Sequence, residues 1–432
     1  GIEVVFAERH AVPIVNVELM FDAGYAADQG AALGTSSFAM QMLDEGAGGL
    51  DALAISKRAQ SLGAQLFMGS GVDYSNAGVS ALADKLDPSL ELLATLVREP
   101  TFPQFEIDRV KKQWIAGIAR EKKQPTSIAL RVLPPLLYGE GHPYAMPFSG
   151  TGTEASIGGL TREHLGAYHA KFVRPDNAKI LAVGDTTLAA LMPALERHFG
   201  GWKASGSPPA KTVAPVELPA APRVYLVDQP GAQQSTIIAG VLAPSPKAPN
   251  HLELNTADSI LGGTFTSRLN LNLREDKHWS YGAGSFFGGS IGQRPWIVYA
   301  PVQTDKTAES LTEMRREIDE YIADKPPTAA ELDKIKANDV RSLPGQFETA
   351  SSVLGALRSI ELYDRPDDYV STLKDRTEAQ SLEHVTTAAR ELVRPKALTW
   401  VVVGDLRTIE APVRALKLGE VKVVDADGKV LR

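Results

Sequence analysis

Short stretches of alternating apolar and polar residues lie near the beginning of each half of the chain. One stretch has its apolar positions at Val15, Val17, Leu19 and Phe21, and apolar residues also mark 224–226 and 237–241. Alternation with a period of two is typical of a half-buried β-strand. Helical stretches follow in both halves, and each half has an apolar strand before a Gly-Asp pair. The pattern predicts an α+β fold in which one order of elements occurs twice.

One helix can be predicted closely from an apolar stripe that consists of Ile107, Val110, Trp114, Ile115 and Ile118. These positions lie on one face of an α-helix. Pro125 is expected to end the helix, because proline cannot donate a backbone N–H. Gly117 lies inside it, where glycine costs about 1 kcal/mol relative to alanine at an exposed position. Gly117 therefore needs either a packing reason or a lost function.

An internal repeat supports the duplication. The segment from Glu163 to Asp185 matches the segment from Glu383 to Asp405 without a gap, with eight identities over 23 positions. Between the copies, residues 200–222 contain five prolines and show no periodicity, which predicts an extended linker. We therefore predict two duplicated, homologous α+β domains, residues 1–210 and 211–432, joined by a Pro-rich linker.

Composition and charge exclude several classes of function. The 45 Lys and Arg residues against 52 Asp and Glu residues give a net charge of -7, which argues against a basic surface for nucleic acid. No apolar stretch approaches the roughly 20 residues of a membrane-spanning helix. The chain has no cysteine, so disulfides, thiolate zinc sites and cysteine nucleophiles are excluded. Gly1 leads directly into an apolar stretch, so we expect that a preceding segment, such as an export signal, was removed.

Motifs for independent chemistry are lacking. None of the eight histidines belongs to an H-x-x-E-H or H-E-x-x-H pair, and His164 and His169 are five positions apart on a predicted helix, which directs them to different faces. We expect both to be ordinary surface residues. The G-x-S-x-G pattern at 288–292 lacks the strand before it and the helix after it that a serine nucleophile requires. The glycine pairs at 262–263 and 282–284 are not followed by the Lys-Ser/Thr of a phosphate loop.

Several strings resemble one peptidase family. In the first half these are Phe21-Asp-Ala-Gly24, Gly63-Ala-Gln-Leu66, and Thr161-Arg-Glu-His-Leu165 followed by Arg174-Pro175; in the second half it is the stretch from Leu261-Gly-Gly through Leu273-Arg-Glu275 to Tyr281. Together they resemble a pitrilysin-type (insulinase-type, mitochondrial-processing-peptidase-like) zinc metallopeptidase over nearly the whole chain. The internal duplication is what the fold of that family implies.

The resemblance also shows what this chain lacks. Active members of the family carry H-x-x-E-H on the helix after Phe-Asp-Ala-Gly. By resemblance, Ser37 and Gln41 stand at the two histidine positions, Met40 at that of the general base, and Gly117 at that of a third, glutamate ligand. Catalytic zinc needs three protein ligands and a water that a base can deprotonate. We therefore expect this chain to bind no metal, to be inactive alone, and to keep the helix around Ser37 as a structural element.

The second half keeps two residues that the family uses for substrate, Arg274 and Tyr281. The resemblance implies that they bind the peptide near the scissile bond and stabilise charge on its carbonyl oxygen, as oxyanion donors do. The alternative is that Arg274 pairs with Glu275 or Asp276 in solvent and that Tyr281 is a half-buried strand residue. Arg268, near the start of the same helix, is expected to hold local structure.

These expectations lead to one main hypothesis about function. The chain would be the non-metal subunit of a heterodimeric zinc metallopeptidase that cleaves peptides, with zinc on a homologous partner. A catalytically inert structural subunit, similar to the core proteins of respiratory complexes, is the main alternative, and a stand-alone peptide-binding protein is a third. Paired bacterial members of this family are often exported, so the resemblance favours the periplasm over the cytoplasm.

Overall fold

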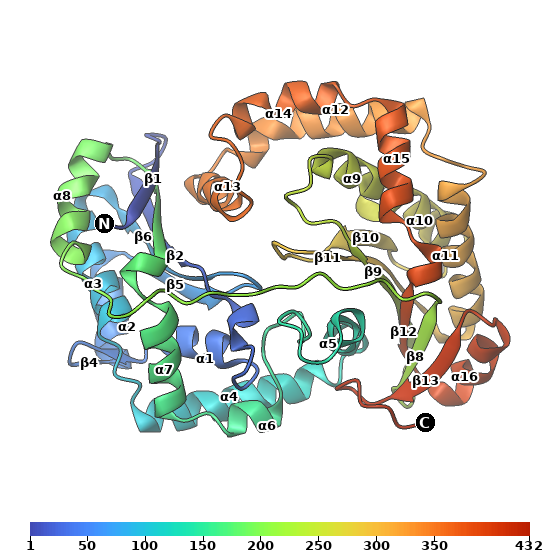
Figure 1. Ribbon diagram of the computed structural model, residues 1–432, viewed down its shortest axis with the longest axis horizontal. Helices are drawn as coiled ribbons and strands as arrows, with labels where there is room; N and C mark the ends of the chain where they lie inside the picture. The colour runs from blue at the N-terminus through green and yellow to red at the C-terminus, as the bar shows by residue number, and fades with distance from the viewer. The chain divides into compact units, whose positions relative to one another are not determined.

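The computed structural model describes residues 1–432, which form two compact units. Unit 1 comprises residues 1–118, 150–212 and 344–366, and unit 2 comprises residues 119–149, 213–343 and 367–432. Each unit has one mixed β-sheet with helices around it, as Figure 1 shows. The predicted α+β fold with two homologous domains is confirmed. None of the helices has the length and apolar character needed to cross a membrane.

The sheet of unit 1 has the strand order β1-β7-β2-β6-β5. Its strands are β1 (Glu3–Glu8), β2 (Ile14–Phe21), β5 (Gln65–Ser70), β6 (Ser75–Leu82) and β7 (Ala178–Gly184), and β3 (Gly46–Ala47) and β4 (Leu50–Asp51) form a separate hairpin. The helices are α1 (Thr35–Gln41), α2 (Ala52–Leu62), α3 (Leu86–Arg98), α4 (Gln104–Glu121), α6 (Glu154–Gly158), α7 (Arg162–Phe172), α8 (Leu188–Phe199) and α13 (Ala350–Leu362), with 3₁₀ turns η1 (Tyr25–Asp28), η2 (Ala83–Lys85) and η3 (Pro175–Asn177).

The sheet of unit 2 has the strand order β10-β11-β9-β12-β8-β13. Its strands are β8 (Arg223–Asp228), β9 (Gln234–Ala243), β10 (Gly284–Phe287), β11 (Arg294–Gln303), β12 (Thr399–Gly404) and β13 (Glu420–Val424). The helices are α5 (Pro125–Tyr138), α9 (His251–Asp258), α10 (Arg268–Asn270), α11 (Thr307–Ile322), α12 (Ala329–Gln346), α14 (Tyr369–Glu378), α15 (Leu382–Leu392) and α16 (Leu406–Ala415), with π-helices η4 (Ser259–Gly263) and η5 (Leu271–Asp276) and 3₁₀ turns η6 (Thr304–Lys306) and η7 (Pro395–Ala397).

The two sheets repeat the same pairing register. Glu8 of β1 pairs with Gly184 of β7, and Asp228 of β8 pairs in parallel with Gly404 of β12. Pro175 and Pro395 each open a 3₁₀ turn before the equivalent strand, and Asp185 and Asp405 each follow its last glycine. These positions confirm that Pro175 is equivalent to Pro395 and Asp185 to Asp405. The shared register has a physical reason, because the side-chain pattern of each strand sets its pairing.

Two equivalent helices are exchanged between the halves of the sequence. Helix α5, from the first half, packs on β9 and β12 of unit 2, and α13, from the second half, packs on β2 and β7 of unit 1. The compact units therefore differ from the predicted contiguous domains 1–210 and 211–432. The physical reason is that each sheet has an apolar second face, which the exchanged helix covers.

Burial of this second face contradicts the prediction that residues 15–21 form a half-buried strand. Val15, Val17, Leu19 and Phe21 lie in the main core of unit 1, as expected for one face of a strand. The intervening residues Asn16, Glu18 and Met20 are also buried, on the face that α13 covers. The strand is therefore buried on both faces and not half-buried.

The predicted stripe of the long helix is confirmed in α4. Ile107, Val110 and Ile118 are buried in the core, and Trp114 and Ile115 pack against it. The helix ends at Glu121, and Pro125 is the first residue of α5, where its missing N–H costs no hydrogen bond. The stretch 203–221 has no helix or strand, as predicted for a linker, and Arg174 anchors it by donating hydrogen bonds to the carbonyls of Gly206 and Ser207.

Candidate functional site

Helix α1 is the helix that would carry a zinc motif, and it is a short structural element. It begins after Gly34, which has a φ of 89°. The buried carboxylate of Asp28 accepts hydrogen bonds from the N–H groups of Gly34 and Ser36, at 2.8 and 2.9 Å. Burial raises the pKa of Asp28 to about 7, against the lowering effect of these N–H donors. The carboxylate therefore satisfies the first N–H groups of the helix from inside the protein.

The three α1 positions have three different environments. Met40 is fully buried and belongs to the hydrophobic core of unit 1. Ser37 is partly exposed, although its hydroxyl oxygen is buried and has no hydrogen-bond partner. Gln41, one turn later, is exposed. The helix thus uses Met40 for packing, which agrees with its predicted structural role.

Gly117 lies in α4 and is partly buried. One turn before it, the ring of Trp114 packs edge-on against Phe38 of α1, with the ring centroids 5.4 Å apart, and its Nε1 donates a hydrogen bond to the carbonyl of Thr151. Helices α1 and α4 are therefore in direct contact. The helix that carries the predicted third-ligand position, Gly117, therefore contacts the helix that carries Ser37 and Gln41.

The donor set at this place does not fit zinc. A hydroxyl, an amide and a glycine offer none of the imidazole or carboxylate ligands that zinc requires. Across the structure, no group of three or more His, Asp or Glu side chains is arranged to hold a metal ion. No step of a reaction can therefore be assigned to a metal held by these residues.

Close packing explains the two glycines of the Leu261-Gly-Gly string in unit 2. A Cβ on Gly262 would lie 2.6 Å from the backbone nitrogen of Ser285, and one on Gly263 would lie 2.7 Å from a carboxylate oxygen of Asp258. Asp258 is buried, which raises its pKa, and it accepts hydrogen bonds from Ser285 and from Nε1 of Trp296. Gly262 therefore allows the π-helix η4 to approach β10 closely, and Gly263 leaves room for the carboxylate of Asp258.

Arg274 lies in the second π-helix, η5, and its side chain is 37% exposed. Its guanidinium carbon lies 4.5 Å from the centre of the Phe265 ring, a cation–π contact, and its Nε lies 3.5 Å from the carboxylate of Glu275. Asp276 instead pairs with Lys277, at 2.6 Å. The contact with Glu275 is that of a solvated pair, which holds a side chain only weakly.

Tyr281 lies in the loop between η5 and β10 and is 88% exposed. Its hydroxyl makes no hydrogen bond, while the preceding Ser280 donates one to the carbonyl of Pro301, which anchors the loop to β11. The alternative of a half-buried strand residue is therefore wrong, because the strand begins three residues later, at Gly284. An exposed phenol without a partner remains available to a ligand.

The sequence prediction missed three residues beside this pair. Phe265 and Leu271 are exposed by 65% and 45%, and the ring of Phe265 lies against the Arg274 guanidinium. Asn270 is buried, donates a hydrogen bond to the carbonyl of Phe265, and accepts one from the N–H of Ala283. Asn270 thus joins the Phe265 loop to the Tyr281 loop. We call Phe265, Leu271, Arg274 and Tyr281 the 265–281 surface.

Other sequence candidates have structural roles. Arg268 binds the carboxylate of Glu331 through two nitrogens, both at 2.7 Å, which confirms its predicted local role. Ser290 lies in a loop and donates a hydrogen bond to the carbonyl of Gln293, so the G-x-S-x-G pattern forms no nucleophile turn. His164 is exposed and accepts a hydrogen bond from the N–H of Thr161 at the start of α7, as a surface residue can. His169 is instead half-buried, with Nε2 2.7 Å from the carbonyl of Val97.

Comparisons with known proteins agree with this arrangement. Residues 3–142 match the family described as insulinase (peptidase family M16), and residues 159–338 match the peptidase M16 inactive domain. A solved structure of a peptidase M16 inactive domain from Pseudomonas fluorescens is similar, with a TM-score of 0.86 and 27% identity over 94% of this chain and 96% of that one.

Two relatives bear names of opposite meaning. An uncharacterized zinc protease of Mycobacterium bovis is 23% identical over 91% of this chain and 89% of its own length. A non-peptidase homolog of Helicobacter pylori is 21% identical over 94% of this chain and 92% of its own length. Both similarities span both halves of the chain. With the duplicated fold and the two matching domain families, they show that this chain belongs to peptidase family M16.

Proposed function

We propose that this chain is the non-metal subunit of a heterodimeric zinc peptidase of family M16. A homologous partner supplies the zinc site, and the 265–281 surface of this chain binds the peptide. The observation that carries the proposal is the pairing of two features in one molecule. Helix α1 and Gly117 lack every zinc donor, while Arg274 and Tyr281 keep exposed donor groups that no strong internal contact occupies.

The chemistry of the pair suits a peptide near its scissile bond. A guanidinium and a phenol are both hydrogen-bond donors, and fixed donors stabilise the negative charge that develops on a carbonyl oxygen during hydrolysis. Asn270 joins the two loops that carry Phe265 and Tyr281, so the backbones of these loops are held together before a ligand arrives. Phe265 and Leu271 add apolar contact area for a peptide side chain.

The decisive experiment joins this chain to a homologous subunit that contains H-x-x-E-H, and measures peptide cleavage by the purified complex. Arg274→Ala and Tyr281→Phe are each expected to lower turnover by roughly a hundred- to a thousandfold, the usual effect of removing one oxyanion donor. Both side chains are exposed, so folding and pairing are expected to persist in size-exclusion chromatography.

Matched controls are Arg315→Ala and Tyr299→Phe, which change the same residue types elsewhere in unit 2. Arg315 is 32% exposed and pairs with Asp319, and Tyr299 is 37% exposed on β11. Both control complexes should keep the wild-type rate. If the Arg274 and Tyr281 variants also cleave at that rate, the proposal fails and the structural alternative replaces it.

The absence of zinc donors leads to a separate prediction for the chain alone. After saturation with zinc and gel filtration, elemental analysis should find well below one zinc per chain, because Ser37, Gln41 and Gly117 supply no strong ligand. The chain without its partner should also cleave no peptide. One tightly bound zinc per chain, or chelator-sensitive cleavage by the chain alone, would contradict the proposal.

The alternative is a catalytically inert subunit of a larger complex. The similarity to a relative named as a non-peptidase homolog favours it, because such a protein keeps the fold without the chemistry. The two functions differ in what they require of the 265–281 surface, which a scaffold does not need. For location we propose the periplasm, which fractionation of cells that express the full-length protein would test.

A further inference from the structure

The duplication makes it possible to compare equivalent sheet edges in the two units. In unit 2, β8 is covered by a sixth strand, β13, which pairs with it in parallel from Glu420 opposite Arg223 to Val424 opposite Val227. In unit 1, the equivalent strand β1 is the last strand of its sheet. Unit 1 therefore lacks one strand that its own homologue has, and the edge of β1 has unpaired backbone groups.

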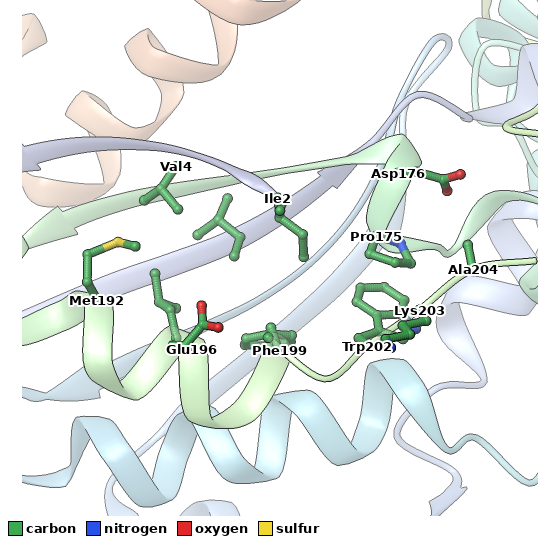
Figure 2. A pocket seen from close by; sticks show the side chains of 14 residues that line it. Ile2, Val4, Pro175, Asp176, Met192, Glu196, Phe199, Trp202, Lys203 and Ala204 are labelled. Carbon is green, nitrogen blue, oxygen red and sulfur yellow. The ribbon is translucent and has the colours of Figure 1, made fainter.

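The edge strand β1 is more exposed to solvent than its equivalent β8, which β13 covers. Val224 and Leu226 of β8 are fully buried, whereas Val4 and Phe6 at the equivalent positions of β1 are half-buried. A groove of about 520 Å³ lies between the start of β1 and α8, and Ile180 of β7 also lines it. Figure 2 shows Ile2 and Val4 of the β1 side facing Met192 and Phe199 of α8 across this groove.

The chain after α8 explains why the edge is left uncovered. In unit 2 the chain runs from α16 directly into β13. In unit 1 the ring of Trp202 packs instead against Phe21, at 6.4 Å between centroids. Beyond it, Arg174 holds the carbonyls of Gly206 and Ser207. These contacts direct the chain into the linker, and residues 202–204 line the groove without forming a strand.

Charge indicates which segment fits. In unit 2 the first pair of the register is Glu420 opposite Arg223, and the residue equivalent to Arg223 in β1 is Glu3. Glu3 and Glu8 lie at the two ends of β1, and both are exposed; Glu3 lies 3.1 Å from Lys179, and Glu8 lies 2.7 Å from His10. A second copy of β1, paired antiparallel, would place glutamates opposite glutamates, which is unfavourable. Lys179 is shared between Glu3 and Glu361, so the three side chains carry one net negative charge, which a strand with a Lys or Arg near its start would meet with the opposite charge.

We propose that the β1 edge of unit 1 is a docking site for an extended segment of a partner protein, parallel to β1, with alternating β-branched apolar residues and a basic residue opposite Glu3. The segment takes the place that β13 occupies in unit 2. Backbone hydrogen bonds to β1 provide affinity, and the groove beside Met192 accepts the inward-facing apolar side chains. This site is separate from the 265–281 surface and does not depend on the proposed peptidase role.

A peptide from the chain itself is the probe. Residues 418–426 contain the whole of β13, and fluorescence anisotropy of the labelled peptide measures its binding to the full chain. The peptide carrying Glu420→Lys is expected to bind about two- to fivefold more tightly than the unmodified peptide, as for one favourable exposed charge pair, and this advantage should shrink in ~1 M salt. A peptide of the same composition with its valines adjacent should not bind.

Two variants of α8 test the place of binding. Met192→Arg puts a charge into the groove and should weaken binding of the Glu420→Lys peptide by at least about tenfold, because an apolar contact is lost and a charge is buried. Leu188→Arg is the matched control, since Leu188 is 46% exposed on the same helix but does not line the groove. The Leu188→Arg protein should bind the Glu420→Lys peptide with the affinity of the wild-type protein.

Three results would overturn the proposal. The first is no saturable binding of the Glu420→Lys peptide up to ~1 mM, beyond the range of specific recognition. The second is equal weakening by Met192→Arg and Leu188→Arg. The third is a wild-type dimer in analytical ultracentrifugation that Met192→Arg dissociates, which would assign the groove to a second copy of this chain.

Discussion

Single residues show how a zinc-peptidase helix becomes a structural one. Met40 stands at the position of the family's general base and packs in the core. Gln41 stands at the position of a histidine ligand and is exposed to solvent. One ionisable group next to α1 is Asp28, on the turn before the helix. Its carboxylate is buried and binds the N–H groups of Gly34 and Ser36. Asp28 therefore positions the helix through its backbone and offers nothing to a metal.

Asp28 makes stability depend on pH. Its pKa is raised from 3.8 to about 7 by burial, so the folded protein holds this proton more firmly than the unfolded chain. The stabilisation is complete below about pH 4 and is lost as the pH rises to about 7, by at most about 4 kcal/mol at 1.4 kcal/mol per pKa unit. Urea unfolding at pH 5 and pH 8 should show a smaller difference for Asp28→Asn than for the wild type. An unchanged difference would contradict this role.

At the scale of elements, the seating of α13 on the sheet depends on polar as well as apolar contacts. Glu18 of β2 is fully buried on this face, and Arg358 of α13 binds its two carboxylate oxygens at 2.8 and 2.5 Å. The guanidinium also lies 5.4 Å from the centre of the Tyr74 ring. Ala350 and Leu354 of the same helix cover the apolar part of the sheet. The ion pair thus sits within the apolar contact.

Removing one partner of this ion pair should be costly. Arg358→Met leaves the buried carboxylate of Glu18 without its cation, which typically destabilises a protein by about 3–5 kcal/mol. The exposed pair of Arg414 and Glu410 is the control, and Arg414→Met should cost less than about 1 kcal/mol. Urea unfolding measures the loss of stability in each variant. If both variants lose an equally small free energy of unfolding, water reaches Glu18 when Arg358 is absent and the prediction is wrong.

The sequence predicted the elements that local pattern determines. The repeated strands, the stripe of α4 and the equivalence of Pro175 with Pro395 follow from periodicity and from the internal repeat. It did not predict that Glu18 is buried, because alternation along one strand cannot show which helix covers its polar face. The π-helix around Arg274 and the exposure of Phe265 also depend on packing across the unit. The places of Arg274 and Tyr281 came from family resemblance and not from any local pattern.

For the whole molecule, the exchange of α5 and α13 makes each unit depend on both halves of the sequence. Leu181 and Val183 of β7 are buried under Ala350 and Leu354 of α13, which lie far along the chain. Gly240 of β9 lies against Leu133 of α5, where a Cβ would come within 2.9 Å of the leucine side chain. Neither sheet is therefore completed by the half of the chain that contains its strands.

The exchange predicts how fragments of the chain behave. Residues 1–212 contain all five strands of the unit 1 sheet but lack α13, so Met20, Leu181 and Val183 would be exposed to water. Each such side chain loses about 1.5–3 kcal/mol of burial, which is a large part of the stability of a domain. We expect this fragment to aggregate or to show weak hydrogen-exchange protection in β2 and β7. Adding a peptide of residues 344–366 should restore that protection.

A cut in the linker provides the control for this prediction. Co-expressed fragments 1–217 and 218–432 together retain both exchanged helices, and the cut falls in an exposed stretch without helix or strand. They should assemble into one particle with a urea midpoint near that of the intact chain, since only chain connectivity is lost. If residues 1–212 alone unfold cooperatively at the midpoint of the intact protein, the exchanged helix contributes no stability. The second sheet face would then tolerate solvent, and the covering role of α13 would be refuted.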